Sequence, residues 1–362
     1  MMSLPLYGSL LAGWMAVSVM ALLATGAPQA LRVLLAGLLV ALCGVAGWVA
    51  PTAAQALMGL APALALCVRV SFVHDGGKNG SGAVAAAFIL SGNAALAVAF
   101  GRCDLLFAIM GVGLGVRLVL AHGPRGLDRI GWEALRSGLG GLVMAQGGLS
   151  VLQAQWGGMA DQAGAVLLVC GVLLACGLLA DAAPPGLPGR GMDTLAALPV
   201  VARAADMWPV VQPVLTFMGL ACLAWAALPR TGRQGTPAMA WGAWAVLATG
   251  LPGAATGLPL AACLLVLACM RPTAHDVVDE GYLSWPPFLP GMALVLVLMA
   301  QMAHAPVVAL LAGMSLWPVM ARCEPGMAWH DGVHAMGSRG GLLLVLGCVV
   351  LAAVIHHGGI GP

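Results

Sequence analysis

The sequence predicts an all-α protein, a polytopic bundle of transmembrane helices, from three observations. Of its 362 residues, 61% are hydrophobic and 8% are charged, whereas about a quarter of the residues in a soluble globular domain are charged. Apolar runs of about 20 residues recur along the chain, and each is long enough to cross a bilayer as a helix. These runs lack the alternation of polar and apolar residues that a β-barrel shows. We therefore expect a single integral membrane domain over residues 1–362, surrounded by the lipid bilayer.

Thirteen apolar runs are clear in the sequence, and a fourteenth segment is ambiguous. The ambiguous segment, 192–207, is short and contains Asp193, Arg203 and Asp206, so hydropathy alone would make it a loop. The clear runs lie near residues 4–26, 30–50, 53–73, 83–101, 104–121, 133–154, 163–183, 209–228, 237–254, 255–270, 287–303, 305–320 and 340–356.

The distribution of basic residues favours the interpretation with fourteen spans. Lysine and arginine collect on the cytoplasmic side of membrane proteins. When 192–207 is counted as a span, the basic residues before and after it share one face, except for Arg102 outside and Arg203 within the membrane. With thirteen spans, the later arginines would switch to the opposite face. We therefore expect about 13–14 spans in a bacterial inner membrane, with both termini outside.

The sequence shows no pattern of a nucleic-acid, metal or cofactor site. Its net charge of +2 comes without a basic patch or an acidic tail, so we expect no nucleic-acid partner. The ten cysteines are scattered and form no CxxC pair, which argues for small packing residues rather than metal ligands. No nucleophile stands beside a supporting base. We therefore expect no catalytic residue, no cofactor and no metal in this chain alone.

Arg203 is the strongest functional candidate, because ionisable groups inside a membrane are rare and are usually functional. Charge counting places it within the span 192–207. Asp206 lies one helical turn further along and would pair with it. In the alternative interpretation, 192–207 is an interfacial or re-entrant segment in which Arg203 is solvated.

Asp181 and His304 are two further candidates for a proton path. Asp181 ends the run 163–183, where it is either part of such a path or a solvated span end. His304 stands between two apolar runs, where it is either a relay histidine or a residue of the turn made by Pro306.

Five segments follow one another in the order and spacing of a known family of membrane proteins. They are DLLFAIMGVGLGVRLVL (104–120), EALRSGLGGLVMAQGGLSVLQAQWG (133–157), LAALPVVARAADMW (195–208), VQPVLTFMGLACLAWAALPRTGR (211–233) and MALVLVLMAQMAHAPVVALLAG (292–313). Together they resemble the antiporter-like membrane subunits of respiratory complex I, which multisubunit Na+/H+ antiporters and membrane-bound hydrogenases share. The resemblance implies the antiporter-like subunit fold and other membrane subunits as partners. Arg203 then stands in the place of a functional lysine.

Several residues of the family's proton machinery are missing from this sequence. The glutamate of the fifth span would fall near Gly113, and the lysine of the seventh would fall near Ala180. Arginine replaces lysine poorly, because its pKa is too high for it to release a proton. The resemblance therefore implies a divergent, partly degenerate proton-translocating subunit of a quinone- or hydrogenase-linked redox complex, with a structural or partial proton-path role.

The enzyme class follows from this interpretation and has an alternative. The chain would be a non-catalytic subunit of an oxidoreductase complex of the NADH:quinone oxidoreductase or hydrogenase type. The alternative is a stand-alone polytopic transporter or permease for a small solute.

Overall fold

The computed structural model describes residues 4–26, 28–49, 80–99, 102–123, 126–127, 129–178, 191–227, 237–252, 254–269 and 288–320. Twelve helices make up almost all of this part of the chain, and one antiparallel pair of two-residue strands joins two of them. The predicted all-α class is confirmed. The helices are α1 (Leu4–Thr25), α2 (Gln29–Val49), α4 (Gly80–Ala99), α5 (Cys103–Ala121), α6 (Arg129–Ala154), α7 (Met159–Ala175), α8 (Gly191–Met207), α9 (Val211–Ala227), α10 (Pro237–Thr249), α11 (Ala254–Cys269), α13 (Leu289–His304) and α14 (Pro306–Met320); the strands are β1 (His122–Gly123) and β2 (Gly126–Leu127).

Twelve of the fourteen predicted segments coincide with these helices. The predicted runs 53–73 and 340–356 lie outside the described residues. Over the part of the chain that the structure describes, none of the helices combines the length and the hydropathy of a membrane span.

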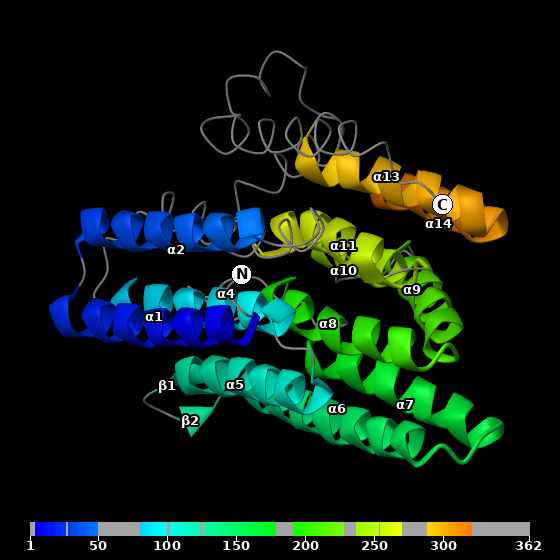
Figure 1. The fold of residues 1–362 in the computed structure, drawn as a ribbon, viewed down its shortest axis with the longest axis horizontal. Helices are drawn as coiled ribbons and strands as arrows, with labels where there is room; N and C mark the ends of the chain where they lie inside the picture. The colour runs from blue at the N-terminus through cyan, green and yellow to red at the C-terminus, as the bar shows by residue number, and fades with distance from the viewer. Residues whose placement is uncertain are drawn as a thin grey trace.

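The ambiguous segment 192–207 is a helix, α8, and it lies at the centre of the bundle. It packs against α4, α5, α7, α9, α10 and α11, and all its residues from Thr194 to Ala202 are buried. Figure 1 shows α8 between the layer of α5, α6 and α7 and the layer of α10 and α11. The charged residues that made this segment look like a loop are therefore carried by a core helix.

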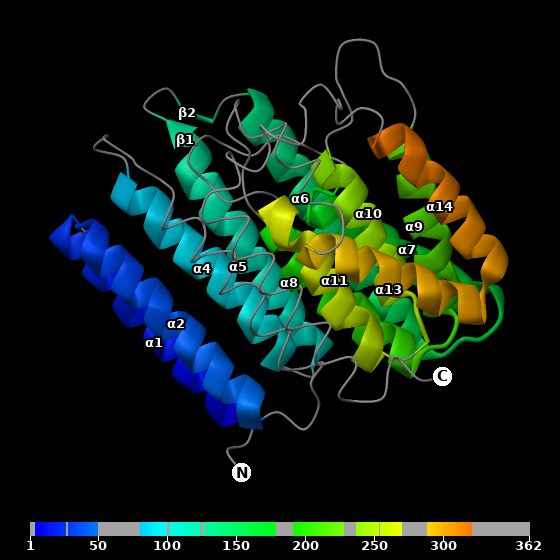
Figure 2. The same cartoon turned by 90° about the horizontal axis from the view of Figure 1, so that it is seen from above.

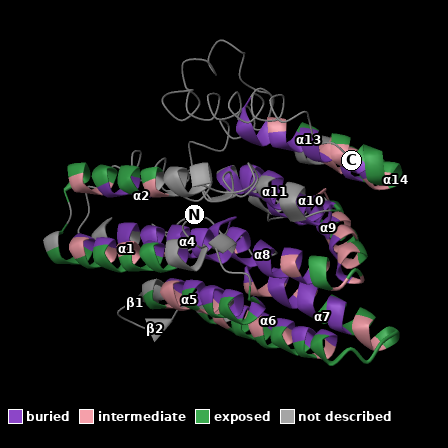
Figure 3. Cartoon of the chain, in the orientation of Figure 1, coloured by how far each residue is buried: buried purple, intermediate pink, exposed green. Residues whose placement is uncertain are grey.

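The remaining helices surround this centre. Seen from above, α1 and α2 form one end of the bundle, and α9 and α14 form the other (Figure 2). Colouring by burial shows exposed faces on the outer helices α1, α2 and α6, whereas α8 and α10 are buried along most of their length (Figure 3).

A tight turn joins α6 to α7 and makes them an antiparallel hairpin. Gln155, Gly157 and Gly158 all have positive φ angles, a conformation that glycine adopts without the steric cost of a Cβ. The backbone N–H of Gly157 donates to Asp161 Oδ1 at 3.2 Å, which ties the turn to the first turn of α7. The sequence Gln-Trp-Gly-Gly thus ends one helix and starts the next.

A proline separates α13 from α14, as the sequence indicated. Pro306 is the first residue of α14, where its missing N–H costs nothing because the first N–H groups of a helix lack intrahelical acceptors. The backbone N–H of Ala305 donates to the carbonyl of Gln301 at 2.7 Å and closes the end of α13.

Candidate functional site

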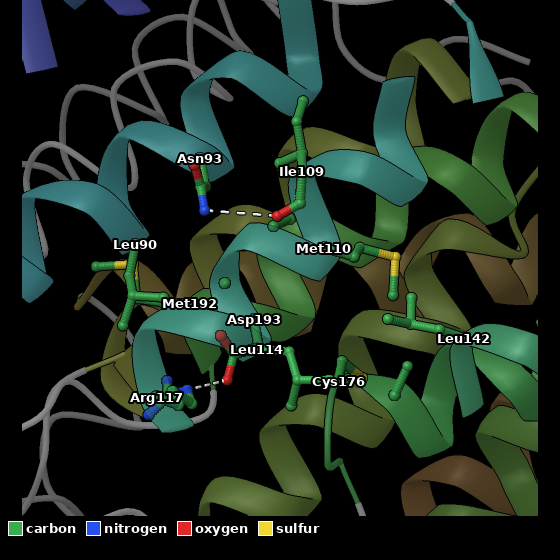
Figure 4. Close-up of a pocket in the computed structure, with 13 residues that line it drawn as sticks. Leu90, Asn93, Ile109, Met110, Leu114, Arg117, Leu142, Cys176, Met192 and Asp193 are labelled. Carbon is green, nitrogen blue, oxygen red and sulfur yellow. Dashed lines mark hydrogen bonds and ion pairs between the residues drawn. The ribbon is translucent and has the colours of Figure 1, made fainter. Parts of the chain in front are cut away.

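A buried ion pair joins the C-terminal part of α5 to the first turn of α8. Nε of Arg117 faces Oδ2 of Asp193, and the two side chains are 4% and 12% exposed. Figure 4 shows the two side chains pointing toward one another across the helices. Removing a charge from water costs several kcal/mol, so a buried charge is found with a partner. The pair therefore fixes the end of α5 against the start of α8.

Asn93 of α4 brings a third polar side chain to the same place. It is 4% exposed, and its Nδ2 donates to the backbone carbonyl of Ile109 on α5 at 3.5 Å (Figure 4). Because 3.5 Å is long for such a bond, it is a weak tie between α4 and α5. An amide, a guanidinium and a carboxylate from three helices thus converge inside an apolar core.

A small cavity lies among these groups. Its volume is about 20 Å³, measured as the space open to the centre of a water molecule. Besides the three polar side chains, Gly113 of α5 lines it. A Cβ added at Gly113 would lie 3.6 Å from Asp193 Oδ1 and 3.8 Å from Asn93 Nδ2. The missing side chain of Gly113 therefore leaves space beside the polar atoms.

The described side chains of this site offer charge and hydrogen bonding: a guanidinium and an amide that donate, and a carboxylate that accepts. Among the described residues, no three histidines, cysteines or acids come together as metal ligands. No disulfide joins the cysteines whose side chains the structure describes, and Cys170 Sγ lies 4.0 Å from Met218 Sδ across α7 and α9.

Arg203, the strongest candidate from the sequence, lies at the other end of the same two helices. It is half-buried and lies within electrostatic range of Cys103 at the start of α5. Arg117 near the end of α5 meets Asp193 at the start of α8, and Cys103 at the start of α5 lies near Arg203 toward the end of α8. The two helices therefore run antiparallel. The described part of the chain shows no ion pair between Arg203 and Asp206, whose side chain is exposed. The predicted local pair is therefore not seen: Asp206 is exposed, whereas Arg203 is half-buried.

Of the other two predicted candidates, the structure describes His304, which does not join the buried site. His304 is exposed at the end of α13, directly before the break at Pro306. Asp181 lies outside the described residues. A role in a proton path stays a prediction for Arg203, Asp206, Asp181 and His304.

The sequence interpretation missed Arg117 and Asp193 as a pair. In the sequence, Arg117 is one of the basic residues expected on the cytoplasmic face, and Asp193 lies too far from Arg203 along the segment 192–207 to pair with it. The sequence signal that could have indicated this pair is one isolated basic residue, Arg117, and one isolated acidic residue, Asp193, inside or beside apolar runs. Their pairing depends on which helices are neighbours, and that is a tertiary property.

Comparison with known proteins shows a likeness in structure but not in sequence. No family model matches this chain, and no curated protein does. Among solved structures, the chain is similar to one from the structure of respiratory complex I from Thermus thermophilus with bound aureothin. The TM-score is 0.62 at 16% sequence identity, and the match covers 93% of this chain and 96% of that chain. This protein therefore has the fold of a chain of respiratory complex I.

Proposed function

We propose that this chain is a divergent antiporter-like subunit of a membrane-bound redox complex that is linked to a quinone or a hydrogenase. The observation that carries the proposal is the fold match to a complex I chain over nearly the full length of both chains. A likeness of this extent includes the order of the helices as well as their packing. It supports a subunit that takes the same kind of place in an assembly.

The composition and the surface support a membrane location, which we propose to be a bacterial inner membrane. Only 8% of the residues are charged. Large apolar side chains stand exposed on several outer helices, whereas soluble monomers rarely expose large continuous apolar patches. In the proposed setting, lipid and neighbouring subunits cover these apolar side chains. The exposed side chains include Val17 and Met20 of α1, Leu139 and Val143 of α6, Met299 and Met302 of α13, and Leu310 and Met314 of α14.

The proposed role is structural, or at most that of a partial proton path. By the sequence resemblance, the family's acid would fall near Gly113, and the polar groups beside Gly113 are Asp193 and Asn93. Arg117 holds the Asp193 carboxylate in an ion pair. A continuous path needs a series of groups that exchange protons, whereas this site brings together one carboxylate, one amide and one guanidinium.

Affinity purification in a mild detergent followed by mass spectrometry tests the proposal. We expect other membrane subunits to co-purify with the tagged chain, together with subunits that carry flavin or iron–sulfur clusters or with hydrogenase subunits. An unrelated membrane protein with the same tag is the control. A single monodisperse protein without partners would overturn the proposal and favour a stand-alone transporter.

The first prediction concerns topology. We expect fourteen spans with both termini outside, because only this arrangement keeps the basic loops on one side. A reporter that is active outside the cell should be inactive when fused at residue 231 and active when fused after residue 362. A fusion at Gly157 is the control, because that turn is expected outside with thirteen or fourteen spans. An active reporter at residue 231 would refute the fourteen-span arrangement.

The second prediction concerns ion transport by the isolated chain. We expect no exchange of protons for sodium, because an acid is missing at Gly113 and a lysine is missing near Ala180. Proteoliposomes that contain the purified chain, placed under an imposed pH gradient, measure this activity. Saturable proton flux that depends on sodium and exceeds that of empty liposomes would contradict the prediction.

A further inference from the structure

The hollow beside Gly113 has the size of one water molecule. By the measure used above, a cavity needs about 10–15 Å³ to hold a water, and this one offers about 20 Å³. The wall also contains apolar side chains, among them Leu90 of α4 and Leu114 of α5. A cavity of this size with a purely apolar wall would stay dry, so the polar groups of the wall determine whether this one holds a water molecule.

The polar part of the wall offers a hydrogen-bond donor from Asn93 and an acceptor from Asp193. An amide nitrogen carries two N–H groups, and the described structure gives Asn93 Nδ2 one long bond to Ile109. A carboxylate offers about four acceptor positions, so Asp193 can accept a further hydrogen bond while it faces Arg117. Asn93 Nδ2 and Asp193 Oδ1 lie 3.8 and 3.6 Å from the point where a Cβ of residue 113 would stand, so both border the space beside Gly113.

We propose that this hollow binds one water molecule, which accepts a hydrogen bond from Asn93 and donates one to the Asp193 carboxylate. The water completes the hydrogen bonding of two buried groups, and buried waters typically make about three such bonds. Gly113 is the residue that makes the site possible, because any side chain there would occupy the hollow. The site holds α4, α5 and α8 together at the buried ion pair, whatever assembly the chain belongs to.

Two substitutions at Gly113 and one at Gly115 test the proposal on the purified protein. Gly113→Ala adds a methyl group at ordinary contact distance from its neighbours, so it displaces the water without a clash. Gly113→Ser adds a hydroxyl as well, which can donate and accept hydrogen bonds beside Asn93 and Asp193. Gly115→Ala is the matched control on the same helix, because nothing lies within 4 Å of a Cβ there.

We expect the water to be lost in Gly113→Ala and replaced by the hydroxyl in Gly113→Ser. The melting temperature of Gly113→Ala should fall below that of Gly115→Ala by about 1–2 °C for each kcal/mol lost, although both changes favour the helix equally. Gly113→Ser should recover most of this difference. A structure at a resolution that shows ordered waters should contain one between Asn93 and Asp193.

Two results would overturn the water site. One is an empty hollow in such a structure, and the other is equal melting of Gly113→Ala and Gly115→Ala. Both measurements use the protein alone, so their outcome does not depend on whether redox subunits co-purify with the chain. The water site and the proposed function can therefore fail separately.

Discussion

Arg117→Ala is expected to lower the free energy of unfolding by about 3–5 kcal/mol, because it leaves the buried Asp193 carboxylate without its counter-charge. Arg117 is 4% exposed and Asp193 is 12% exposed, so water cannot replace the lost partner at low cost. Equilibrium unfolding of the purified protein in detergent measures the change. Asp193→Ala should cost a similar amount for the same reason.

The chain contains a matched control for this prediction. Arg102 and Asp104 also form an ion pair, with Nη2 and Oδ2 3.1 Å apart, but their side chains are 77% and 59% exposed. Exposed pairs contribute about 0–1 kcal/mol because water and salt screen the charges. Arg102→Ala should therefore change stability little. If Arg117→Ala costs no more than Arg102→Ala, the buried pair does not hold α5 against α8.

A double substitution separates the loss of the pair from the loss of one charge. Replacing a buried ion pair by apolar residues of similar volume is often neutral or stabilising. Arg117→Met combined with Asp193→Leu should therefore unfold close to the unchanged protein, although each single change is destabilising. Single losses that simply add in the double variant would show that the two side chains do not interact.

The sequence predicts the helices of this fold well because their ends carry local signals. The turn at residues 155–158 contains two glycines, and the break before Pro306 contains a proline. The segment 192–207 needed a different kind of signal. Its charges lower its hydropathy below that of its neighbours, and only the distribution of basic residues over the whole chain indicated an ordered helix there.

The site could not be predicted in the same way, because it depends on how helices are rotated and which of them are neighbours. Asp206 was the obvious partner for Arg203, since the two are one turn apart on a helix. In the structure Asp206 is exposed, and the buried pair forms between Arg117 and Asp193 on different helices. Spacing along the helix predicts Asp206 as the partner of Arg203, but the packing of α8 leaves Asp206 exposed.

Glycine spacing, by contrast, is a sequence feature whose structural meaning can be read directly. Gly141 and Gly148 on α6 and Gly164 and Gly171 on α7 are each seven residues apart, close to two helical turns. In the structure, an added Cβ on Gly141, Gly148 or Gly171 would meet the backbone of the facing helix. The two helices of the hairpin thus approach backbone to backbone, as small residues permit in membrane proteins.

Gly148→Ala is expected to destabilise the protein by about 1–3 kcal/mol, the usual cost of overpacking. The added Cβ would press against the backbone N of Leu168 and would lie 2.6 Å from the carbonyl oxygen of Gly164. Backbone atoms cannot rotate out of the way as a side chain can, so α6 and α7 must move apart. Their separation would also loosen the neighbours Leu149 and Leu152, which are fully buried.

Gly147→Ala is the matched control, because it makes the same chemical change at the adjacent residue of α6. Nothing lies within 4 Å of a Cβ at Gly147. Alanine favours a helix over glycine by up to about 1 kcal/mol, so this variant should be slightly more stable than the unchanged protein. The two neighbouring substitutions should therefore shift the unfolding midpoint in opposite directions, since only one of them faces α7. Equal shifts of the same sign would mean that α6 and α7 do not approach each other along this glycine face.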